Sequence, residues 1–168
     1  MQESINQIIF AFHKQNGSVQ RKMPIFRNMT EEDIEQVADL ERRIFSDPWT
    51  SQGIYETFCQ NQAFIVVAEQ DEKVVGYGII YYVLDEGEIV RIAVDETVRR
   101  QGVGRRILDY ACECCKKENV KRLLLDVRES NASARSFYEQ YGFLVDGMRK
   151  NFYEKPNENA VLMSKELV

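Results

Sequence analysis

Apolar residues recur at two different spacings in the first half of the chain, and these spacings predict its secondary structure. From Ile34 to Phe45 they recur every three or four residues, which predicts an amphipathic helix that Pro48 terminates. Thr50 and Ser51 offer caps for a second helix that carries Ile54, Tyr55 and Phe58. Short β-rich runs between polar turns predict strands at 25–27, 63–69, 74–84 and 88–94. Because short turns join the last three runs, we expect them to form an antiparallel meander.

The second half of the chain alternates between helical and strand patterns. Residues 103–117 have an apolar stripe of helical period, and 120–127 is a continuous apolar run, typical of a strand buried on both faces. This order of strand, helix and strand predicts a crossover between parallel strands. A last helix is expected from Asn131 to Gly142, before two closing strands at 143–153 and 160–167. The expected fold is therefore α/β (α+β), with a mixed central sheet of about seven strands and about four helices.

The turn before the 103–117 helix carries the clearest chemical signal. It reads Arg-Arg-Gln-Gly-Val-Gly-Arg-Arg over residues 99–106, so four arginines surround two glycines. The glycines let backbone N–H groups come close to a ligand, and the start of a helix leaves its first N–H groups free for an anion. Arginine side chains strengthen the preference for phosphate. A strand followed by this turn and a helix therefore predicts a pyrophosphate-binding site.

Two common nucleotide motifs do not fit this turn. A Walker-type loop ends in glycine, lysine and then serine or threonine, and the chain has no such run. A dinucleotide fingerprint has a third glycine or alanine at the position held here by Ile107. On the turn alone, the alternative is an ordinary glycine-containing loop before a helix.

Length, charge and cysteine content limit the possible classes of protein. With 168 residues the chain suits one domain, or one domain with an appendage. Its net charge of −5 argues against a general binder of nucleic acid or of anionic membranes. No apolar run approaches the roughly 20 residues of a membrane-spanning helix.

Three of the four cysteines lie within 103–117, and the sole histidine, His13, is far from them in the sequence. This pattern suits neither a disulfide framework nor a zinc site. We therefore expect no bound metal, and reduced thiols in a cytoplasmic protein. Cys114 falls on the apolar stripe of its helix and is expected in the core.

Residues 1–24 differ from the remainder, and we expect them to be an N-terminal extension to a domain at 25–168. Ile5, Ile8 and Phe12 fall at helical spacing, which predicts a short amphipathic helix. Such a helix is either a dispensable addition or a docking element, and the pattern favours the first.

Arg99, Gly102 and Gly104 form the pattern Arg-x-x-Gly-x-Gly, which resembles the acetyl-coenzyme A (acetyl-CoA) signature of the GNAT superfamily of N-acetyltransferases. The order of the expected elements, with this turn after the fourth strand, also resembles the fold of that superfamily. Within it, the chain is most similar to the ribosomal-protein-alanine N-acetyltransferases, the RimI type, through segments 45–49, 84–86, 92–94, 125–131 and 137–143. The resemblance covers about residues 24–167.

The resemblance implies how acetyl-CoA would be held. The backbone of Ile92, Ala93 and Val94 would face the acyl thioester and the pantetheine arm, and one N–H of this strand could stabilise an oxyanion. Asn131 would use its side-chain amide on the coenzyme, although its position equally suits a helix cap. The turn would hold the pyrophosphate through Arg99, Arg100, Gln101, Gly102, Val103, Gly104 and Arg105.

Tyr138 is the candidate acid of the implied reaction. It lies two helical turns after Asn131, and its phenol could protonate the departing thiolate. The alternative is a core tyrosine. We expect Phe137 and Tyr141 to supply the inward face of their helix, which leaves Tyr138 on a different face.

The candidate base is Asp126. The family has a glutamate at this position, so aspartate is a departure that shortens the side chain by one methylene. It keeps the carboxylate needed to accept a proton from an amine, directly or through water. The alternative is an aspartate that only ends an apolar strand. Glu88, on the neighbouring strand, is the reserve base.

The resemblance implies an enzyme that transfers an acetyl group from acetyl-CoA directly to the N-terminal α-amino group of a protein, a ribosomal protein in this subfamily. Two other functions stay open: an acetyltransferase of a small-molecule amine, and a catalytically impaired module that only binds acyl-CoA. The expected partners are acetyl-CoA and a protein N-terminus, without direct nucleic-acid or membrane binding. The sequence does not decide between a monomer and a homodimer.

Overall fold

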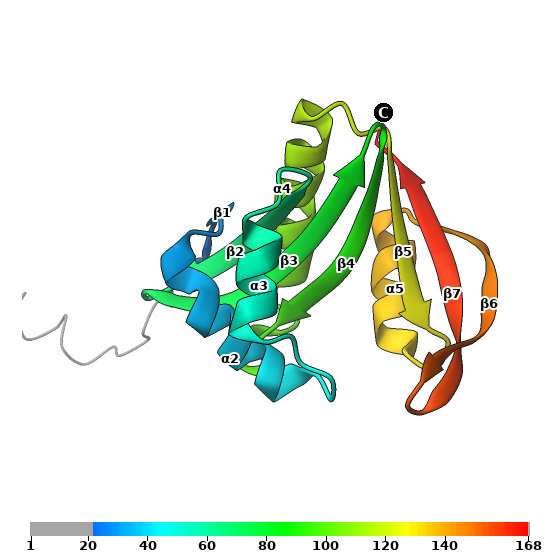
Figure 1. The fold of residues 1–168 in the computed structure, drawn as a ribbon, viewed down its shortest axis with the longest axis horizontal. Helices are drawn as coiled ribbons and strands as arrows, with labels where there is room; N and C mark the ends of the chain where they lie inside the picture. Colours follow the sequence, from blue (N-terminus) through cyan, green and yellow to red (C-terminus); the bar gives the residue numbers. More distant parts are fainter. Residues whose placement is uncertain (1–21, 168) are drawn as a thin grey trace, which may run out of the picture.

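A seven-stranded sheet organises the computed structural model, which describes residues 22–167. The helix expected around residues 5–12 lies outside the described residues. The strands lie in the order β1-β2-β3-β4-β5-β7-β6, and only the β4–β5 pair is parallel (Figure 1). Their bounds are β1 Ile25–Asn28, β2 Ala63–Gln70, β3 Lys73–Val83, β4 Glu86–Val94, β5 Arg122–Arg128, β6 Leu144–Glu154 and β7 Asn157–Glu166.

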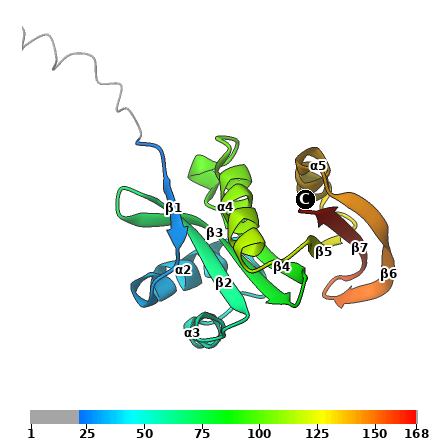
Figure 2. The same ribbon diagram turned by 90° about the horizontal axis from the view of Figure 1, so that it is seen from above.

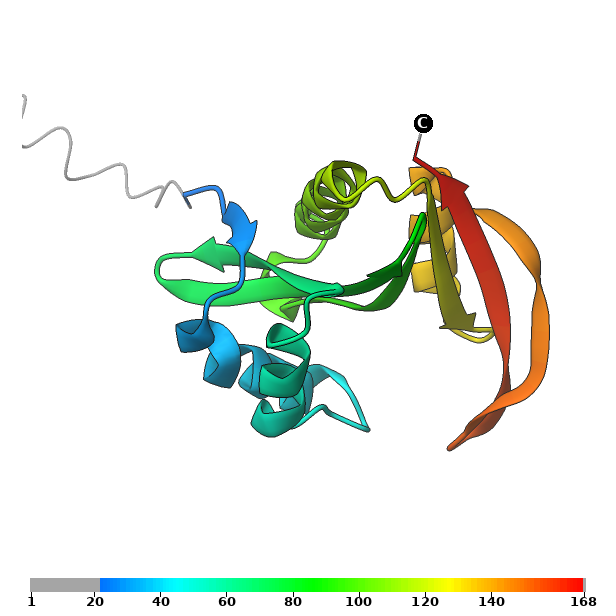
Figure 3. The ribbon, with the colours of Figure 1, turned by 45° about the horizontal axis from the view of Figure 1, so that its top comes forward.

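Four α-helices cover the sheet, together with two short 3-10 turns, in the described part of the chain. Helices α2 and α3 lie on one face, and α4 and α5 lie on the other (Figure 3). The predicted meander, crossover helix and closing strands are therefore confirmed. The bounds are η1 Glu31–Asp33, α2 Ile34–Ile44, α3 Ser51–Phe58, η2 Glu96–Val98, α4 Val103–Lys117 and α5 Ala132–Tyr141.

Each face of the sheet has its own core. On one face, α4 buries Ile107 and Leu108 against Leu125 and neighbouring apolar side chains of the sheet. On the other, α2 buries Val37 and Leu40 against β2 and β3. Burying an aliphatic side chain of this size contributes about 1.5–3 kcal/mol. The helical spacing of apolar residues in the sequence thus becomes the contact surface of each helix.

The parallel strands β4 and β5 stay paired for only a short distance. Their register joins Glu86 to Arg122, Gly87 to Leu123 and Glu88 to Leu124, and then ends. Beyond this point the two strands diverge, as the views along and across the sheet show (Figure 1 and Figure 2). Helix α4 therefore belongs to one half of the sheet and α5 to the other.

A β-bulge interrupts β4 just after the paired segment. Ile80 of β3 lies opposite Ile89, whereas the next residue, Ile79, lies opposite Arg91, so Val90 is the extra residue. A bulge shifts the alternation of side chains between the two faces. Val90 and Arg91 both lie on the face that carries α2, where Val90 packs against that core and Arg91 reaches Glu41.

Three expectations about packing were wrong. Strand β5 is not buried on both faces: its odd-numbered residues, such as Leu123 and Leu125, are buried and the even-numbered ones are half-buried. Cys112 and Cys115, rather than Cys114, are the buried thiols of α4. The third, which concerns α5, is described with the site. For Cys114 and Tyr138 the error concerns which side of a helix faces the sheet, whereas for β5 one face is only half-buried.

Strand β6 forms one edge of the sheet and is irregular. Its pairing with β7 shifts between Val145 and Gly147 and again between Arg149 and Tyr153. Several large apolar side chains of this strand are exposed: Leu144, Val145, Met148 and Phe152.

Asp95 links α2 to the segment that leads into α4. Its carboxylate accepts hydrogen bonds from the Thr97 hydroxyl at 2.7 Å and the Thr97 backbone N–H at 3.0 Å, and it pairs with Arg43. The hydroxyl of Thr97, followed by its N–H and the Arg43 guanidinium, lowers the pKa of Asp95 to about 2. A depressed pKa means that this carboxylate stabilises the fold above the unfolded-state pKa, near 4, and that the contribution is lost as the pH falls toward 2.

We predict that Asp95→Ala lowers the free energy of unfolding at pH 7 by about 1–2 kcal/mol, because a cap and an ion pair are removed. The difference from wild type should shrink between pH 4 and pH 2, as measured by chemical or thermal unfolding followed by circular dichroism. Asp39→Ala is the control, since Asp39 makes an exposed pair with Arg42. A deficit of the same size at pH 2 and pH 7 would contradict the prediction.

Candidate active site

The glycine-containing turn forms the start of α4, as the sequence predicted. Gly102 caps the helix with φ = +78°, a left-handed conformation that glycine adopts without steric cost. In the first helical turn, the N–H groups of Val103, Gly104 and Arg105 have no acceptor within the helix. Three N–H groups and the helix dipole therefore face the same place, which is the arrangement that binds a phosphate.

Gly104 of this turn lies close to both β4 and α5. A methyl group at this position would lie 3.5 Å from Val94 Cγ2 and 3.7 Å from Phe137 Cζ. The first turn of α4 thus meets the end of β4 and the α5 helix at one point. The predicted turn, strand and final helix come together here, although α5 belongs to the other half of the sheet.

The long polar side chains at residues 99, 100, 101 and 105 of the turn divide into two groups. Arg99 donates from Nε to the Val94 carbonyl oxygen at 2.9 Å, and Gln101 donates to the Thr97 carbonyl oxygen at 3.3 Å, so both shape the turn itself. Arg100 and Arg105 are exposed. The charges of Arg100 and Arg105 are therefore available to an anionic ligand.

The backbone of β4 presents free groups where the strands diverge. The Asp95 N–H donates to the Val75 carbonyl at 2.8 Å, and in an antiparallel pair the residues that bond to the neighbour alternate. Ala93 therefore bonds back to β3, whereas the N–H groups of Ile92 and Val94 point the other way. Of the three residues expected at the acyl group, these two offer N–H donors.

Asn131 caps helix α5. Its side-chain Oδ1 accepts a hydrogen bond from the Ala134 N–H at 3.1 Å. The structure thus bears out the capping alternative for this residue. The Nδ2 donor group of the same amide is not used by this contact.

Tyr138 lies deeper than its helix pattern suggested. It is only 9% exposed, whereas Phe137 and Tyr141, expected to form the inward face of α5, are half-buried. Its ring packs edge-on against Phe137 and Phe143, at 5.1 and 5.5 Å between centroids. Phe137 and Tyr141 do pack against the core, as expected, but Tyr138 is buried in that same core and does not lie on a different face.

The surroundings of Tyr138 affect its ionisation. Burial, with a smaller contribution from Tyr153, raises the pKa of its phenol. The hydroxyl therefore carries its proton at neutral pH. Among residues 22–167 no hydrogen bond to this hydroxyl is found.

The two candidate bases lie on the opposite face of the sheet from α5. Glu88 is opposite Leu124 in the parallel register, and Asp126 is two residues further along the same strand face. Asp126 is half-buried and its Oδ2 accepts a hydrogen bond from Arg149 Nη1 at 3.1 Å. Glu88 is exposed and belongs to the last residue pair of the two strands. Asp126 lies two residues beyond that pair, where the strands have begun to diverge.

The sequence interpretation missed a buried polar cluster on this same face. Glu41 of α2 is fully buried and contacts Tyr77, Arg91 and the backbone of Trp49. A signal was present in the sequence, because a glutamate at a core-facing position of an amphipathic helix requires a partner. Its partners could not be identified from the spacing of residues, because Arg91 lies on this face only as a result of the bulge in β4.

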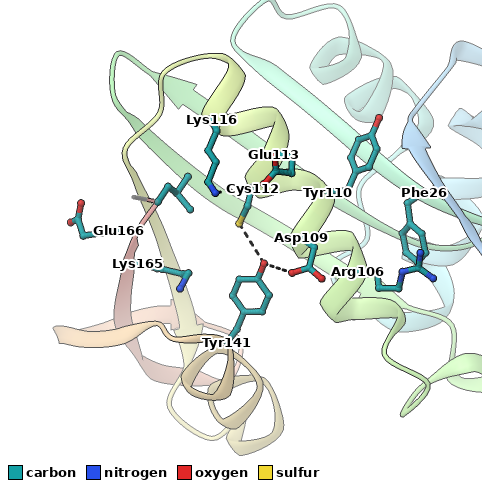
Figure 4. Close-up of a pocket in the computed structure, with 11 residues that line it drawn as sticks. Phe26, Arg106, Asp109, Tyr110, Cys112, Glu113, Lys116, Tyr141, Lys165 and Glu166 are labelled. Carbon is teal, nitrogen blue, oxygen red and sulfur yellow. Dashed lines mark hydrogen bonds and ion pairs between the residues drawn. The ribbon is translucent and has the colours of Figure 1, made fainter.

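A separate hollow of about 580 Å³ lies between α4, α5 and the end of β7 (Figure 4). Tyr141 crosses it: its hydroxyl donates a hydrogen bond to Asp109 Oδ1 at 2.6 Å and lies 3.6 Å from Cys112 Sγ. Burial, then the bond to Asp109, raises the pKa of Tyr141. None of the residues expected in the active site lines this hollow. The contacts of Tyr141 within it connect α5 to α4.

The comparisons with known proteins agree with this geometry. The sequence matches the model of the acetyltransferase (GNAT) family over residues 34–143. The chain belongs to this family. It is accordingly an acetyl-CoA-dependent N-acetyltransferase, and the matched residues include the turn at the start of α4.

Two bacterial relatives match most of this family member. A Bacillus subtilis (strain 168) protein, provisionally named a ribosomal protein bS18-alanine N-acetyltransferase, is 37% identical over 138 residues, or 82% of this chain and 91% of that protein. The ribosomal protein bS18-alanine N-acetyltransferase of Escherichia coli (strain K12) is 34% identical over 137 residues, or 79% of this chain and 90% of that protein.

Solved structures extend the likeness to three dimensions. The ribosomal-protein-S18-alanine N-acetyltransferase from Escherichia coli has a TM-score of 0.79 at 29% identity, covering 86% of this chain and 94% of that one. Ard1 from Thermoplasma volcanium has a TM-score of 0.80 at 28% identity, covering 88% and 99%. Strand order and helix positions are thus those of the GNAT fold.

Residues 22–167 contain neither a candidate metal site nor a candidate membrane-spanning helix. No group of three or more histidine, cysteine, aspartate or glutamate side chains in this part of the chain is arranged to hold a metal ion. Within the same residues no helix has the length and apolar character needed to cross a membrane.

The cap at Asn131 yields a prediction that separates its two interpretations. Asn131→Ala should lower the free energy of unfolding by about 1 kcal/mol, because the Ala134 N–H loses its acceptor. Asn131→Asp should keep wild-type stability, since a carboxylate caps equally well and suits the positive end of a helix. Thermal unfolding measures both.

Titration with acetyl-CoA then tests the second interpretation on the same variants. If the amide also contacts the coenzyme, Asn131→Asp binds acetyl-CoA more weakly although its cap is intact. Equal affinity of the aspartate variant and wild type would limit Asn131 to capping.

Proposed function

We propose that the protein transfers the acetyl group of acetyl-CoA to the N-terminal α-amino group of a ribosomal protein in the cytoplasm. The observation that carries this proposal is the pair of outward-facing N–H groups of Ile92 and Val94, beside the phosphate-binding turn of α4. The substrate class comes from the two relatives named for bS18 alanine, which match about four fifths of the chain.

The coenzyme would lie along the divergence of β4 and β5. Its diphosphate would accept hydrogen bonds from the first turn of α4 and face Arg100 and Arg105. Its thioester would lie beside Ile92 and Val94, where one N–H would bind the oxygen that becomes negative in the tetrahedral intermediate. Preorganised donors of this kind supply much of the rate enhancement in acyl transfer.

The acceptor amine would come from the face that carries Asp126. An α-amino group has a pKa near 8, so a useful fraction is neutral at physiological pH, whereas lysine at about 10.4 is almost fully protonated. Asp126, directly or through water, would accept the proton that the nitrogen loses as the new C–N bond forms. Glu88 is the reserve base. The chemistry thus favours an α-amine over a lysine side chain.

Tyr138 would complete the reaction from the other side of the sheet. Collapse of the tetrahedral intermediate breaks the C–S bond and leaves a thiolate on coenzyme A. A buried phenol that keeps its proton can donate it to this sulfur, so that neutral thiol departs. The base and the acid therefore act from opposite faces.

Acetyl transfer to defined peptides tests the function. A peptide with the first residues of bS18 should release coenzyme A thiol and gain one acetyl group at its α-amine, as located by mass spectrometry. The matched control is the same peptide with a blocked N-terminus and a lysine within it. Turnover only on small-molecule amines would contradict the proposal, as would tight acetyl-CoA binding without any turnover.

Tyr138→Phe should lower kcat by about 100-fold, which is within the usual range for loss of a general acid. The dissociation constant for acetyl-CoA should stay within about twofold, because the ring still packs against its neighbours. Steady-state kinetics and calorimetric titration measure the two effects. Wild-type turnover in this variant would remove Tyr138 as the acid.

Asp126→Asn should abolish the dependence of kcat/KM on an ionised carboxylate, and Glu88→Gln should leave that dependence in place. The comparison is a pH–rate profile of each variant with the peptide substrate. The opposite result would exchange the roles of the two residues. Both changes are near-isosteric, so each variant should fold. Thermal unfolding verifies this.

A further inference from the structure

A fully buried carboxylate lies on the acceptor face, apart from the residues assigned to the reaction. Glu41, in the second half of α2, has no exposed side-chain surface. Its Oε2 accepts a hydrogen bond from the Trp49 backbone N–H at 2.9 Å, and its Oε1 accepts one from the Tyr77 hydroxyl. A well-packed apolar side chain would often serve stability equally well or better at such a position. The carboxylate therefore needs an explanation beyond stability.

Tyr77 of β3 holds the Glu41 carboxylate from the side of the sheet. Burial and the neighbouring Glu41 raise the pKa of the Tyr77 phenol, so its hydroxyl remains a donor throughout the physiological range. Tyr77 itself is completely buried in β3. Glu41 is thus fixed to the sheet on one side and to the Trp49 backbone on the other.

Arg91 brings a positive charge to the same carboxylate. Its Nε lies 3.6 Å from Glu41 Oε1, and only 12% of its side chain is exposed. The extra residue at Val90 places Arg91 on this face. Directly after Arg91 comes Ile92, whose N–H is one of the two free donors of β4. The pair therefore joins α2 to the strand segment beside the reacting centre.

The guanidinium of Arg91 also holds the segment between α2 and α3. It lies 4.2 Å from the ring centroid of Phe45 and 5.6 Å from that of Trp49. Its Nη2 donates to the Asp47 carbonyl oxygen at 3.0 Å. These contacts, with the Trp49 N–H bond to Glu41, fasten the loop of residues 45–50 at three points along its length.

The loop of residues 45–50 lies on the face of the sheet that carries Asp126, and Arg149 of the edge strand β6 reaches this face, where it donates to Asp126. Burial is the main cause that raises the pKa of Tyr153 in β6, the Asp126 charge adds to it, and the Arg91 charge opposes it. Charges from β4 and β5 therefore both act on one β6 side chain. An acceptor that reaches β4 from this face would meet the loop, because Arg91 of β4 contacts Phe45, Asp47 and Trp49.

We propose that Glu41 and Arg91 are positioning residues that hold the loop of residues 45–50 as one side of the acceptor-binding surface, and so determine the affinity for the acceptor peptide. The identity of the acceptor rests on the proposed function, but the positioning of the loop does not. Arg91 neutralises the buried carboxylate, and the carboxylate in turn orients Arg91 between the two aromatic rings.

The loop carries its own spectroscopic reporter, because Trp49 is the only tryptophan of the chain. Arg91→Ala should shift Trp49 emission to longer wavelength and increase its quenching by iodide, since the ring loses its neighbour. The same variant should raise KM for the acceptor peptide by about 10-fold, with kcat and the acetyl-CoA dissociation constant within about threefold of wild type. Arg91→Lys should give intermediate values, because it keeps the charge but not the planar stacking.

Two further variants complete the experiment. Glu41→Gln keeps an acceptor for the Trp49 N–H but removes the charge that orients Arg91, so KM and quenching should change in the same direction and by less. This variant also serves if Arg91→Ala does not fold. Arg42→Ala is the matched control, because Arg42 is an exposed arginine of the same helix that pairs only with Asp39 among its described neighbours.

The proposal is overturned if folded Arg91 and Glu41 variants keep the wild-type peptide KM. It is also overturned if KM rises without a change in Trp49 quenching, since Arg91 would then contact the acceptor itself. Failure of the wild-type enzyme to acetylate any N-terminal peptide would instead count against the proposed function. In that case the quenching and emission of Trp49 still decide whether Arg91 and Glu41 hold the loop.

Discussion

The short pairing of β4 with β5 is the constraint on which the rest of the structure depends. Two neighbouring strands that stop bonding inside a sheet leave N–H and C=O groups without partners, and such groups are costly when buried. Here these are the N–H groups of Ile92 and Val94, whereas the Val94 carbonyl accepts a hydrogen bond from Arg99. The first turn of α4 adds further free N–H groups at the same end. The unmet hydrogen bonds of the fold are therefore concentrated where a ligand with a diphosphate and an amide-containing arm can satisfy them.

The divergence also explains why the two halves of the sheet need side-chain connections. Helices α4 and α5 belong to different halves, and Tyr141 joins them through its contacts with Asp109 and Cys112. On the other face, Glu41 and Arg91 connect α2 to β4. Of these two connections, only the contacts of Tyr141 join the two halves, whereas the Glu41–Arg91 pair fastens α2 to β4 within one half.

Most of the fold could be predicted from the sequence because its elements have strong local patterns. The helix at 103–117 and the meander before it follow from apolar period and turn residues, and the α4 bounds agree with the structure. The errors concern phase: Cys114 and Tyr138 were assigned to the wrong sides of their helices. Helix phase depends on the surface below it, and a diverging sheet presents a surface that sequence spacing does not describe.

The site could be predicted in part. The turn at 99–106 has a motif whose function resides in the backbone, so local sequence is enough to find it. Asp126 was proposed as the base because the family resemblance implies a carboxylate at that position, and Glu88 because it lies on the neighbouring strand. The cluster of Glu41 with Arg91 depends on a one-residue bulge at Val90, and neither the bulge nor the resulting change of face has a clear signature in the sequence.

The irregular edge strand β6 has a consequence for how the molecule behaves at high concentration. An exposed strand edge with apolar side chains such as Leu144 and Met148 is a template on which a second chain can extend the sheet and begin a fibril. The two shifts in pairing, near Asp146 and between Arg149 and Tyr153, bend that edge. A strand that is bent twice offers no long, straight row of donors and acceptors. The two register shifts therefore reduce the length of regular strand edge with which a second chain could pair.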